Sequence, residues 1–231
     1  MRFDVQYRPS YALALVQLEA GETVVAESGS MVSKDTHVKV ETRAGKKGDG
    51  VLGGLMSGFK RMVAGESFFQ NRFTAHDRAG EVTFAPTLTG DIVVHTLESR
   101  DELYMQSTAF LCSEESVQLD TKWGGAKTFF GGEGLVMLRA TGQGALAFNA
   151  FGGVTVIDVD GSYTVDTGHI VAFEGTLSFR VGRFAGGWRQ FIFGGEGLVC
   201  HFSGKGKLWI QSRNPHAFGQ VIGPLLPMRE N

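Results

Sequence analysis

The sequence is short of cysteine and proline, with two cysteines and five prolines among 231 residues. Cys112 and Cys200 both lie in apolar, strand-like runs, AFLCS and LVCHF, and neither belongs to a Cys-x-x-Cys pair. This pattern excludes a disulfide framework and a cysteine-based zinc site, which need more cysteines at closer spacing. We therefore expect two buried free thiols in a reducing compartment.

The sequence also lacks a basic excess and a long apolar run. Its net charge is −2 and its pI about 6.3, whereas a domain that follows a phosphate backbone carries a strong positive charge, so nucleic acid is not the expected partner. Asp and Arg interrupt the N-terminal stretch MRFDVQYRPSYALALV, and no run of about 18 apolar residues occurs. We expect a cytoplasmic protein, with peripheral attachment to the inner membrane as the alternative.

Glycine is abundant, at 33 residues, which is about twice its usual share. Glycine without proline indicates many tight turns and few helices, and 18 phenylalanines supply material for a core. Stretches such as HVKVET, SVQLDT and TLSFRV alternate with period two, as β-strands do. The composition therefore predicts an all-β fold.

One heptapeptide, FGGEGLV, occurs twice, at residues 130–136 and 193–199. The first copy continues as MLRATGQGALAF and the second as CHFSGKGKLWI, so each predicts a hairpin closed by a Gly-x-Gly turn. A fainter third copy, GESFFQNRFTAHDRAGEVTF, covers residues 65–84. The predicted paired strands are Val136–Leu138 with Ala145–Phe148, and Val199–Phe202 with Lys207–Ile210.

A second element also recurs three times, as ESGSMVS, QSTAFLCS and DTGHIVA. The order of the two elements predicts one all-β domain over residues 1–231. Its units cover about residues 20–100, 101–160 and 161–214, and a C-terminal arm follows at 215–231. A short repeated unit cannot bury its apolar face alone, so we expect the three to pack into a pseudo-threefold β-barrel or β-prism.

Four motifs in order, LEAGETVVAESGSMV, GLMSGFKRMVAGESFFQNRF, VDTGHIVAFE and FGGEGLVCHFSGKGKLWIQSRN, resemble the altered-inheritance-of-mitochondria twenty-four-type family of mitochondrial biogenesis proteins. The resemblance covers roughly residues 2–214. It implies a double-stranded β-helix or β-sandwich similar to that of the tryptophan RNA-binding attenuation protein, assembled as homotrimers or larger rings. It implies no enzymatic activity.

The insertion at residues 43–67 is the first candidate site. Its apolar residues recur at helical spacing beside two basic residues, while its glycines weaken an isolated helix. One interpretation is that it folds onto its own barrel or plugs a trimer. The functional interpretation is an amphipathic loop that contacts a membrane surface or a protein partner. The loop residues are Val51, Leu52, Leu55, Met56, Phe59, Lys60, Arg61 and Met62.

The repeated Gly-Glu pairs are the second candidate. Three carboxylates related by pseudosymmetry could bind a cation through oxygen ligands, but three separate structural turns are favoured because nothing in the sequence makes the turns converge. These residues are Gly65, Glu66, Gly132, Glu133, Gly195 and Glu196.

No catalytic constellation is evident. The six histidines form no His-x-His or His-Glu-x-x-His pattern, and no Gly-x-Ser-x-Gly elbow occurs. The cluster Asp166-Thr167-Gly168-His169 is favoured as a structural turn. We therefore expect no catalytic residue, cofactor or metal, and a scaffold or assembly protein rather than an enzyme; a metal-dependent enzyme of the cupin kind is the weakest alternative.

Two further features bear on partners. The fold resemblance raises a small-ligand- or RNA-binding regulator as the alternative function, for which exposed aromatics beside Lys or Arg would be needed, as at Phe59-Lys60-Arg61. The tail at residues 213–231 holds three of the five prolines and predicts an extended arm. Its apolar residues favour contact with another subunit; these are Val221, Ile222, Leu225 and Leu226.

Overall fold

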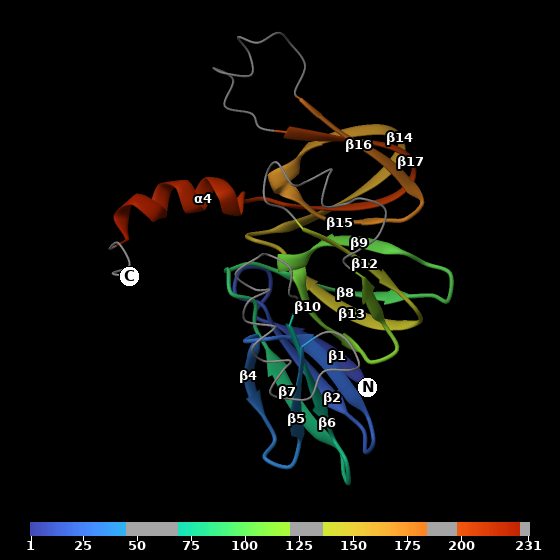
Figure 1. Cartoon of the computed structure of the whole chain (residues 1–231), viewed down its shortest axis with the longest axis vertical. Helices are drawn as coiled ribbons and strands as arrows, with labels where there is room; N and C mark the ends of the chain where they lie inside the picture. The colour runs from blue at the N-terminus through green and yellow to red at the C-terminus, as the bar shows by residue number, and fades with distance from the viewer. Residues whose placement is uncertain (45–68, 121–135, 184–197, 227–231) are drawn as a thin grey trace.

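The computed structural model describes residues 1–44, 69–120, 136–183 and 198–226. It is an all-β structure of curled antiparallel sheets with one short helix, which confirms the predicted fold class (Figure 1). Strands from the N-terminal part of the chain lie towards one end of the long axis, β14 and β16 lie towards the other, and β8, β9, β12 and β13 lie between them.

The first sheet lies at the N-terminal end of the molecule. Its order is β1-β2-β7-β4, which leaves β4 at an edge. In β2 buried and less buried residues alternate, because one face covers the core and the other faces outward. The strands are β1 (Arg2–Gln6), β2 (Leu13–Leu18), β7 (Gly80–Phe84) and β4 (Met31–Lys34).

The second sheet joins the N-terminal and middle parts of the chain, because β3 pairs with β10 at its centre. Its order is β5-β6-β3-β10-β13-β8. The strands are β5 (Lys39–Ala44), β6 (Phe69–Thr74), β3 (Thr23–Glu27), β10 (Phe110–Glu114), β13 (Gly144–Asn149) and β8 (Ile92–Leu97).

The third sheet joins the middle and C-terminal parts in the same way, through the pairing of β9 with β15. Its order is β11-β12-β9-β15-β17-β14, and β16 also pairs with β17. The strands are β11 (Gln118–Asp120), β12 (Met137–Thr141), β9 (Leu103–Gln106), β15 (Ile170–Glu174), β17 (Leu198–Gln211), β14 (Val154–Asp166) and β16 (Leu177–Arg183).

The structure contains three hydrophobic cores, and each includes a contact between aromatic rings. Phe73 of β6 meets Phe84 of β7 at a ring separation of 5.2 Å in the first core. Phe148 of β13 meets Trp209 of β17 at 5.6 Å in the second. In the third, Phe173 packs at 5.0 Å from a phenylalanine of β17. Each of the first two contacts joins neighbouring sheets, so burial of these rings binds the sheets together.

The predicted hairpins are wrong, because the two strands of each do not pair with each other. Strand β12 belongs to the third sheet and β13 to the second, and β6 and β7 are divided in the same way. Gly142 has a φ of 102°, and a Cβ there would lie 2.4 Å from the Ser116 backbone oxygen. The glycine therefore lets the chain cross between sheets beside another backbone, instead of turning back on itself.

The last predicted hairpin is a single strand, β17, of 14 residues. Gly204 has a φ of 119° and lies opposite Gly161 of β14 and Leu177 of β16. Partners on both sides hold the chain extended through this glycine. The Gly-x-Gly sequence thus bends the strand without closing a turn.

The same local arrangement precedes three strands. One-turn 3₁₀ helices, η1 (Ser107–Ala109) and η3 (Thr167–His169), lead into β10 and β15, and a short turn leads into β4. Each strand then shows a register shift after its first residue, at Met31/Ser33, Phe110/Cys112 and Ile170/Ala172. Three internal repeats, their boundaries and the double-stranded β-helix topology stay predictions.

The C-terminal arm is helical rather than extended, so this prediction is wrong. Asn214 accepts hydrogen bonds from the backbone N–H of His216 (2.9 Å) and Ala217 (3.2 Å), which caps α4 (Pro215–Ile222). Pro215 occupies the first turn, where its fixed φ suits a helix and its missing N–H costs nothing. A 3₁₀ turn, η4 (Gly223–Leu225), follows. Among the described residues no helix is long and apolar enough to cross a bilayer.

Candidate functional site

Most residues that the sequence singled out lie outside the described residues. The loop residues Val51, Leu52, Leu55, Met56, Phe59, Lys60, Arg61 and Met62 belong to this group, as do Gly65, Glu66, Gly132, Glu133, Gly195 and Glu196. Their predicted roles stay predictions. The site described below was found from the structure, and of the candidate segments it includes only the C-terminal arm.

The cluster at Asp166–His169 forms a structural turn, as the sequence favoured. The Asp166 carboxylate accepts the Gly168 N–H at 2.8 Å and so caps η3. The Thr167 hydroxyl donates to the Leu198 carbonyl at 2.9 Å, and His169 Nδ1 lies 2.8 Å from the Gln211 carbonyl. Each polar group of the cluster thus has a partner in the fold, which fixes the turn in place.

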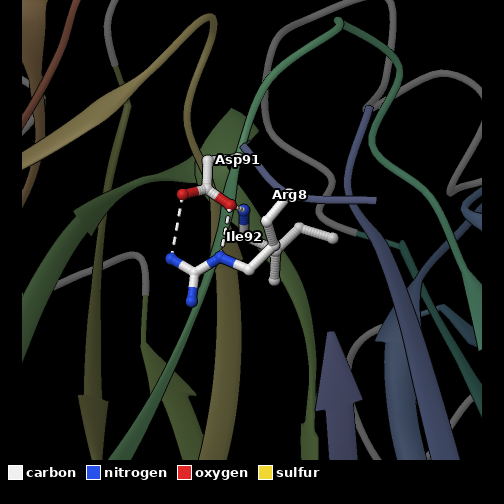
Figure 2. A network of polar contacts seen from close by, with 3 residues as sticks. All are labelled: Arg8, Asp91 and Ile92. Carbon is white, nitrogen blue, oxygen red and sulfur yellow. Dashed lines mark hydrogen bonds and ion pairs between the residues drawn. The ribbon is translucent and has the colours of Figure 1, made fainter. Parts of the chain in front are cut away.

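The N-terminal loop beside the C-terminal helix is fixed by a salt bridge (Figure 2). Arg8 donates to both carboxylate oxygens of Asp91, at 2.8 and 2.9 Å, and the Ile92 N–H donates to the same carboxylate at 2.9 Å. The Asp91 side chain is only 6% exposed, while Arg8 is 53% exposed. The hydrogen bonds to Asp91 raise the pKa of Arg8, and the two-point contact orients the loop.

The base of the helix is held by hydrogen bonds from the end of β17 and the residue that follows it. Gln211 accepts from the Phe151 N–H at 2.8 Å and donates to the Gly168 carbonyl at 2.9 Å. Ser212 then pairs with Gly153 through its backbone N–H and its hydroxyl, both at 2.9 Å. The direction in which the helix leaves the sheet is therefore fixed by the fold.

The helix itself is uncovered. No residue of α4 or η4 is buried, and Figure 1 shows the helix projecting sideways from the stacked sheets. The edge contact of Phe218 with Phe151, at 5.3 Å, covers part of its apolar side, and Ile222 is half-buried. Large apolar side chains remain exposed by the following fractions: Tyr11 74%, Phe218 46%, Val221 67%, Leu225 76% and Leu226 62%.

A hollow of about 580 Å³ lies between the helix and the N-terminal loop. Tyr11 lines it on the loop side, Phe151 on the sheet side, and Phe218 and Val221 on the helix side. Its charged margin is Arg213, and the sequence from Asn214 to Leu226 carries no Asp, Glu, Lys or Arg. We call the helix, η4 and this hollow the helix surface. A projecting apolar helix beside an apolar hollow is suited to binding another protein.

The two cysteines are buried and free, as predicted. Burial raises the pKa of the Cys112 thiol well above its usual range and that of Cys200 to about 12. Thiolates are the reactive form, so both thiols are inert at neutral pH. Burial lowers the pKa of His95, whose ring lies 5.3 Å from that of Trp209.

The fold and its surfaces define a class of all-β proteins built from stacked, curled sheets with a projecting C-terminal helix. The chain belongs to the family described as Mitochondrial biogenesis AIM24, whose model matches residues 3–213. The family resemblance of the four sequence motifs is thereby confirmed.

Two similar proteins come from Streptococcus pyogenes. An uncharacterised protein of serotype M6 is 34% identical over 236 residues, covering 100% of this chain and 93% of that protein. An X-ray crystal structure from a structural genomics programme is 30% identical with a TM-score of 0.77, covering 97% of this chain and 99% of the other. These similarities support the family and the fold, and they carry no activity with them.

Proposed function

We propose that this protein is a non-enzymatic scaffold that assembles with further copies of itself, as a homotrimer or a multiple of three. The observation that carries the proposal is the helix surface. An eight-residue helix is marginal in water, and most helical stability in proteins comes from packing of an apolar face. In this protein the apolar face of α4 is exposed, although hydrogen bonds hold the start of the helix in place. This favours a partner that covers the face.

A second copy is the partner that the chemistry of the surface favours. The stretch from Asn214 to Leu226 carries no Asp, Glu, Lys or Arg, and the lining of the hollow adds Arg213 alone, so apolar contact rather than charge favours the partner. The surface contains both a projecting helix and an adjoining hollow, lined by Tyr11 and Phe151, that an apolar side chain of another copy could enter. A surface with both complementary parts can pair with itself.

The mass of the protein in solution tests this proposal. We expect the wild type to exceed the 25.0 kDa of one chain by light scattering, and Val221→Ser with Leu225→Ser to lower that mass. The matched control is Val94→Ser with Val156→Ser, because these valines are 38% and 45% exposed on strands β8 and β14. A wild type that stays monomeric at micromolar concentration would sink the proposal, as would equal loss of mass in both variants.

The non-enzymatic part of the proposal is supported by the chemistry of the described residues. Within residues 1–44, 69–120, 136–183 and 198–226, no group of three His, Cys, Asp or Glu could hold a metal ion. Both thiols are buried with raised pKa values, and His169 is occupied by the Gln211 carbonyl. A test is metal analysis of the purified protein, where stoichiometric metal would favour the cupin-like alternative.

The loop at residues 51–62 keeps its proposed role as a contact for a membrane surface or a protein partner. Flotation with anionic vesicles separates the two interpretations. A membrane contact predicts that the wild type floats and that Leu55→Ser, Met56→Ser and Phe59→Ser together abolish flotation without changing the oligomeric mass. If neither floats, the loop contact is with a soluble partner or with the protein itself.

A second candidate function, binding of a small anionic ligand, is favoured by a hollow of about 520 Å³ on β14, β16 and β17, whose lining also includes Phe179 and Phe202. Two cross-strand rows line it, Ser162–Ser203–Ser178 and Thr164–His201–Arg180. Further along β14 and β17, two other cross-strand rows contain the ion pairs of Lys205 with Asp160 and of Lys207 with Asp158. The two rows that line the hollow contain only hydroxyl and basic side chains. Such donors without a carboxylate suit an oxyanion.

Titration with inorganic phosphate at constant ionic strength tests this second function. We expect saturable stabilisation against heat, with affinity about tenfold lower in Arg180→Gln, since a charged hydrogen bond is lost. Lys205→Gln is the matched control, because it removes the same charge outside the hollow. Equal weakening in both variants would show only general electrostatic attraction and would exclude the site.

A further inference from the structure

The two junctions inside the molecule are built in the same way. In the first, β10 pairs antiparallel with β3, with Cys112 opposite Ala26. In the second, β15 pairs antiparallel with β9, with Ala172 opposite Met105. Cys112 and Ala172 each follow the register shift of their strand, and Ala26 and Met105 are each the penultimate residue of theirs.

Each junction continues with the same register. Ser113 lies opposite Val25 and Glu114 opposite Val24 in the first junction. In the second, the equivalent pairs are Phe173 with Tyr104 and Glu174 with Leu103. Strand β10 follows η1 and pairs with β3, which ends just before the turn that leads into β4. In the same way, β15 follows η3 and pairs with β9, which ends just before η1.

At the N-terminal end of the molecule, no strand among the described residues takes this place beside β4. Strand β4 has the same register shift and pairs with β7 on one side, but it forms the edge of the first sheet. Its first two residues, Met31 and Val32, are 42% and 57% exposed. At the equivalent positions in the interior junctions Phe110 and Leu111 are 0% exposed, and Ile170 and Val171 are both 1% exposed.

At the opposite end, β14 likewise has no complementary partner within the part of the chain that the structure describes. The last part of β14 pairs with β17 on one side, and β14 is the edge of the third sheet. Val165 is its penultimate residue, equivalent to Ala26 and Met105. Tyr163 is 40% exposed, whereas the equivalent Val24 and Leu103 are 0% exposed. Met31 and Val32 at one end and Tyr163 at the other are thus exposed where the equivalent residues of the interior junctions are covered, while Val165 is buried.

We propose that the edge of β4 in one copy of this chain pairs antiparallel with the end of β14 in the next copy. The register of the interior junctions places Ser33 opposite Val165 and Lys34 opposite Thr164. No like charges meet in these pairs. The partner must be a second copy, since Figure 1 shows β4 and β14 at opposite ends of the long axis, where they cannot meet within one chain.

This pairing deepens the proposed scaffold function and rests on it. The two edges differ, so the contact is heterologous, and every copy retains one edge of each kind until the assembly closes. The strand pairing of the two interior junctions would then be repeated at each contact between chains. Unprotected sheet edges are otherwise a liability for a soluble protein, because they offer unpaired N–H and carbonyl groups to any other strand.

Disulfide cross-linking tests the register. Opposite residues of an antiparallel pair have Cα atoms about 4.5 to 5.5 Å apart, which is within the range for a disulfide. We expect oxidation of the double variant Ser33→Cys with Val165→Cys to replace the monomer band with cross-linked multimers on a non-reducing gel. A mixture of the two single variants should stop at dimers. The native thiols of Cys112 and Cys200 are buried and do not interfere.

Two further variants keep the test decisive. Lys34→Cys with Thr164→Cys occupies the neighbouring pair and avoids the buried Val165, so it covers the case in which the first variant fails to fold. Ser33→Cys with Ser162→Cys is out of register by three residues and should stay monomeric on the gel.

The outcomes separate the interface from the function. Cross-linking of the in-register pairs alone supports the proposal. A light-scattering mass above one chain without cross-linking at either in-register pair overturns this interface and leaves the scaffold function standing. A monomeric mass without cross-linking overturns both. Cross-linking of all pairs alike indicates random collision and also overturns the interface.

Discussion

Strands β4 and β10 have the same local geometry and opposite environments. Both follow a turn and both shift register after their first residue, yet the burial of β10 is nearly complete while β4 is mostly exposed. The difference comes from position, because β10 lies between β3 and β13, and β4 has β7 on one side only. Local sequence therefore determines the shape of the strand, and the neighbouring strands determine how much of it is buried.

The largest expected effect comes from truncating the same position in the two strands. Phe110→Ala removes a fully buried ring and should lower the free energy of unfolding by about 3–5 kcal/mol. Met31→Ala, at a side chain that is 42% exposed, should change it by less than about 0.5 kcal/mol in the monomer. Urea denaturation measures both. Equal losses would mean that β4 is covered even in a single chain.

Two glycines, Gly168 in the turn before β15 and Gly29 in the turn before β4, allow the interior and edge strands to be compared at a second position. A Cβ at Gly168 would lie 2.2 Å from Asn214 Nδ2, so Gly168→Ala should displace the cap of α4 and cost about 2 kcal/mol. Gly29 has open space around it but a φ of 91°, so Gly29→Ala should cost about 1 kcal/mol through backbone strain.

Hydrogen exchange distinguishes the two causes. The amides of α4 should exchange faster in Gly168→Ala and stay unchanged in Gly29→Ala. Faster exchange in both variants would contradict a specific contact between Gly168 and the helix cap.

The interior junctions differ in the residue that ends the partner strand, which predicts a dependence on pH. Glu27 ends β3 where Gln106 ends β9. Burial raises the pKa of Glu27 from 4.5 to about 7, so the folded state favours the protonated form. Its contribution to stability is full below about pH 4.5 and is lost as the pH rises to 7.

Glu27→Gln should therefore stabilise the protein at pH 8 by about 1–2 kcal/mol, after allowance for the partial solvent exposure of Glu27, and much less at pH 4.5. Gln106→Glu is the reciprocal control and should destabilise at pH 8, because Gln106 is 5% exposed and donates to the Thr167 carbonyl at 3.3 Å. Denaturation midpoints at both pH values measure the effect. A gain for Glu27→Gln that does not depend on pH would refute its electrostatic origin.

The smallest effect concerns Cys112, which occupies the position equivalent to Ser33 of β4. Burial at 0% exposure and a raised pKa predict that a thiol reagent labels Cys112 only as fast as the protein unfolds. Ser33→Cys should react like an exposed thiol when the protein is dilute enough to be monomeric. Rapid labelling of Cys112 in the folded protein would contradict the burial of β10.

The sequence alone determined the fold class and the family. Period-two patterning, excess glycine and four ordered motifs sufficed for these, because they depend on local backbone preference and on short segments. It also identified the turn at Asp166–His169 and the buried thiols. The recurrence of ESGSMVS, QSTAFLCS and DTGHIVA likewise located three strands with the same register shift.

Only the tertiary structure decided which strands pair. Gly-x-Gly is compatible with a hairpin, a crossing and a bent strand, and the choice depends on partners such as Ser116 and Leu177 that are distant in sequence. The pairing of Arg8 with Asp91 joins residues 83 positions apart. Exposure of Met31, Val32 and Tyr163 depends on whether a neighbouring strand is present. Similar local sequences do not show whether a strand lies at the edge or in the middle of a sheet. The candidate surfaces are therefore properties of the assembled sheets, because burial depends on what packs against a strand.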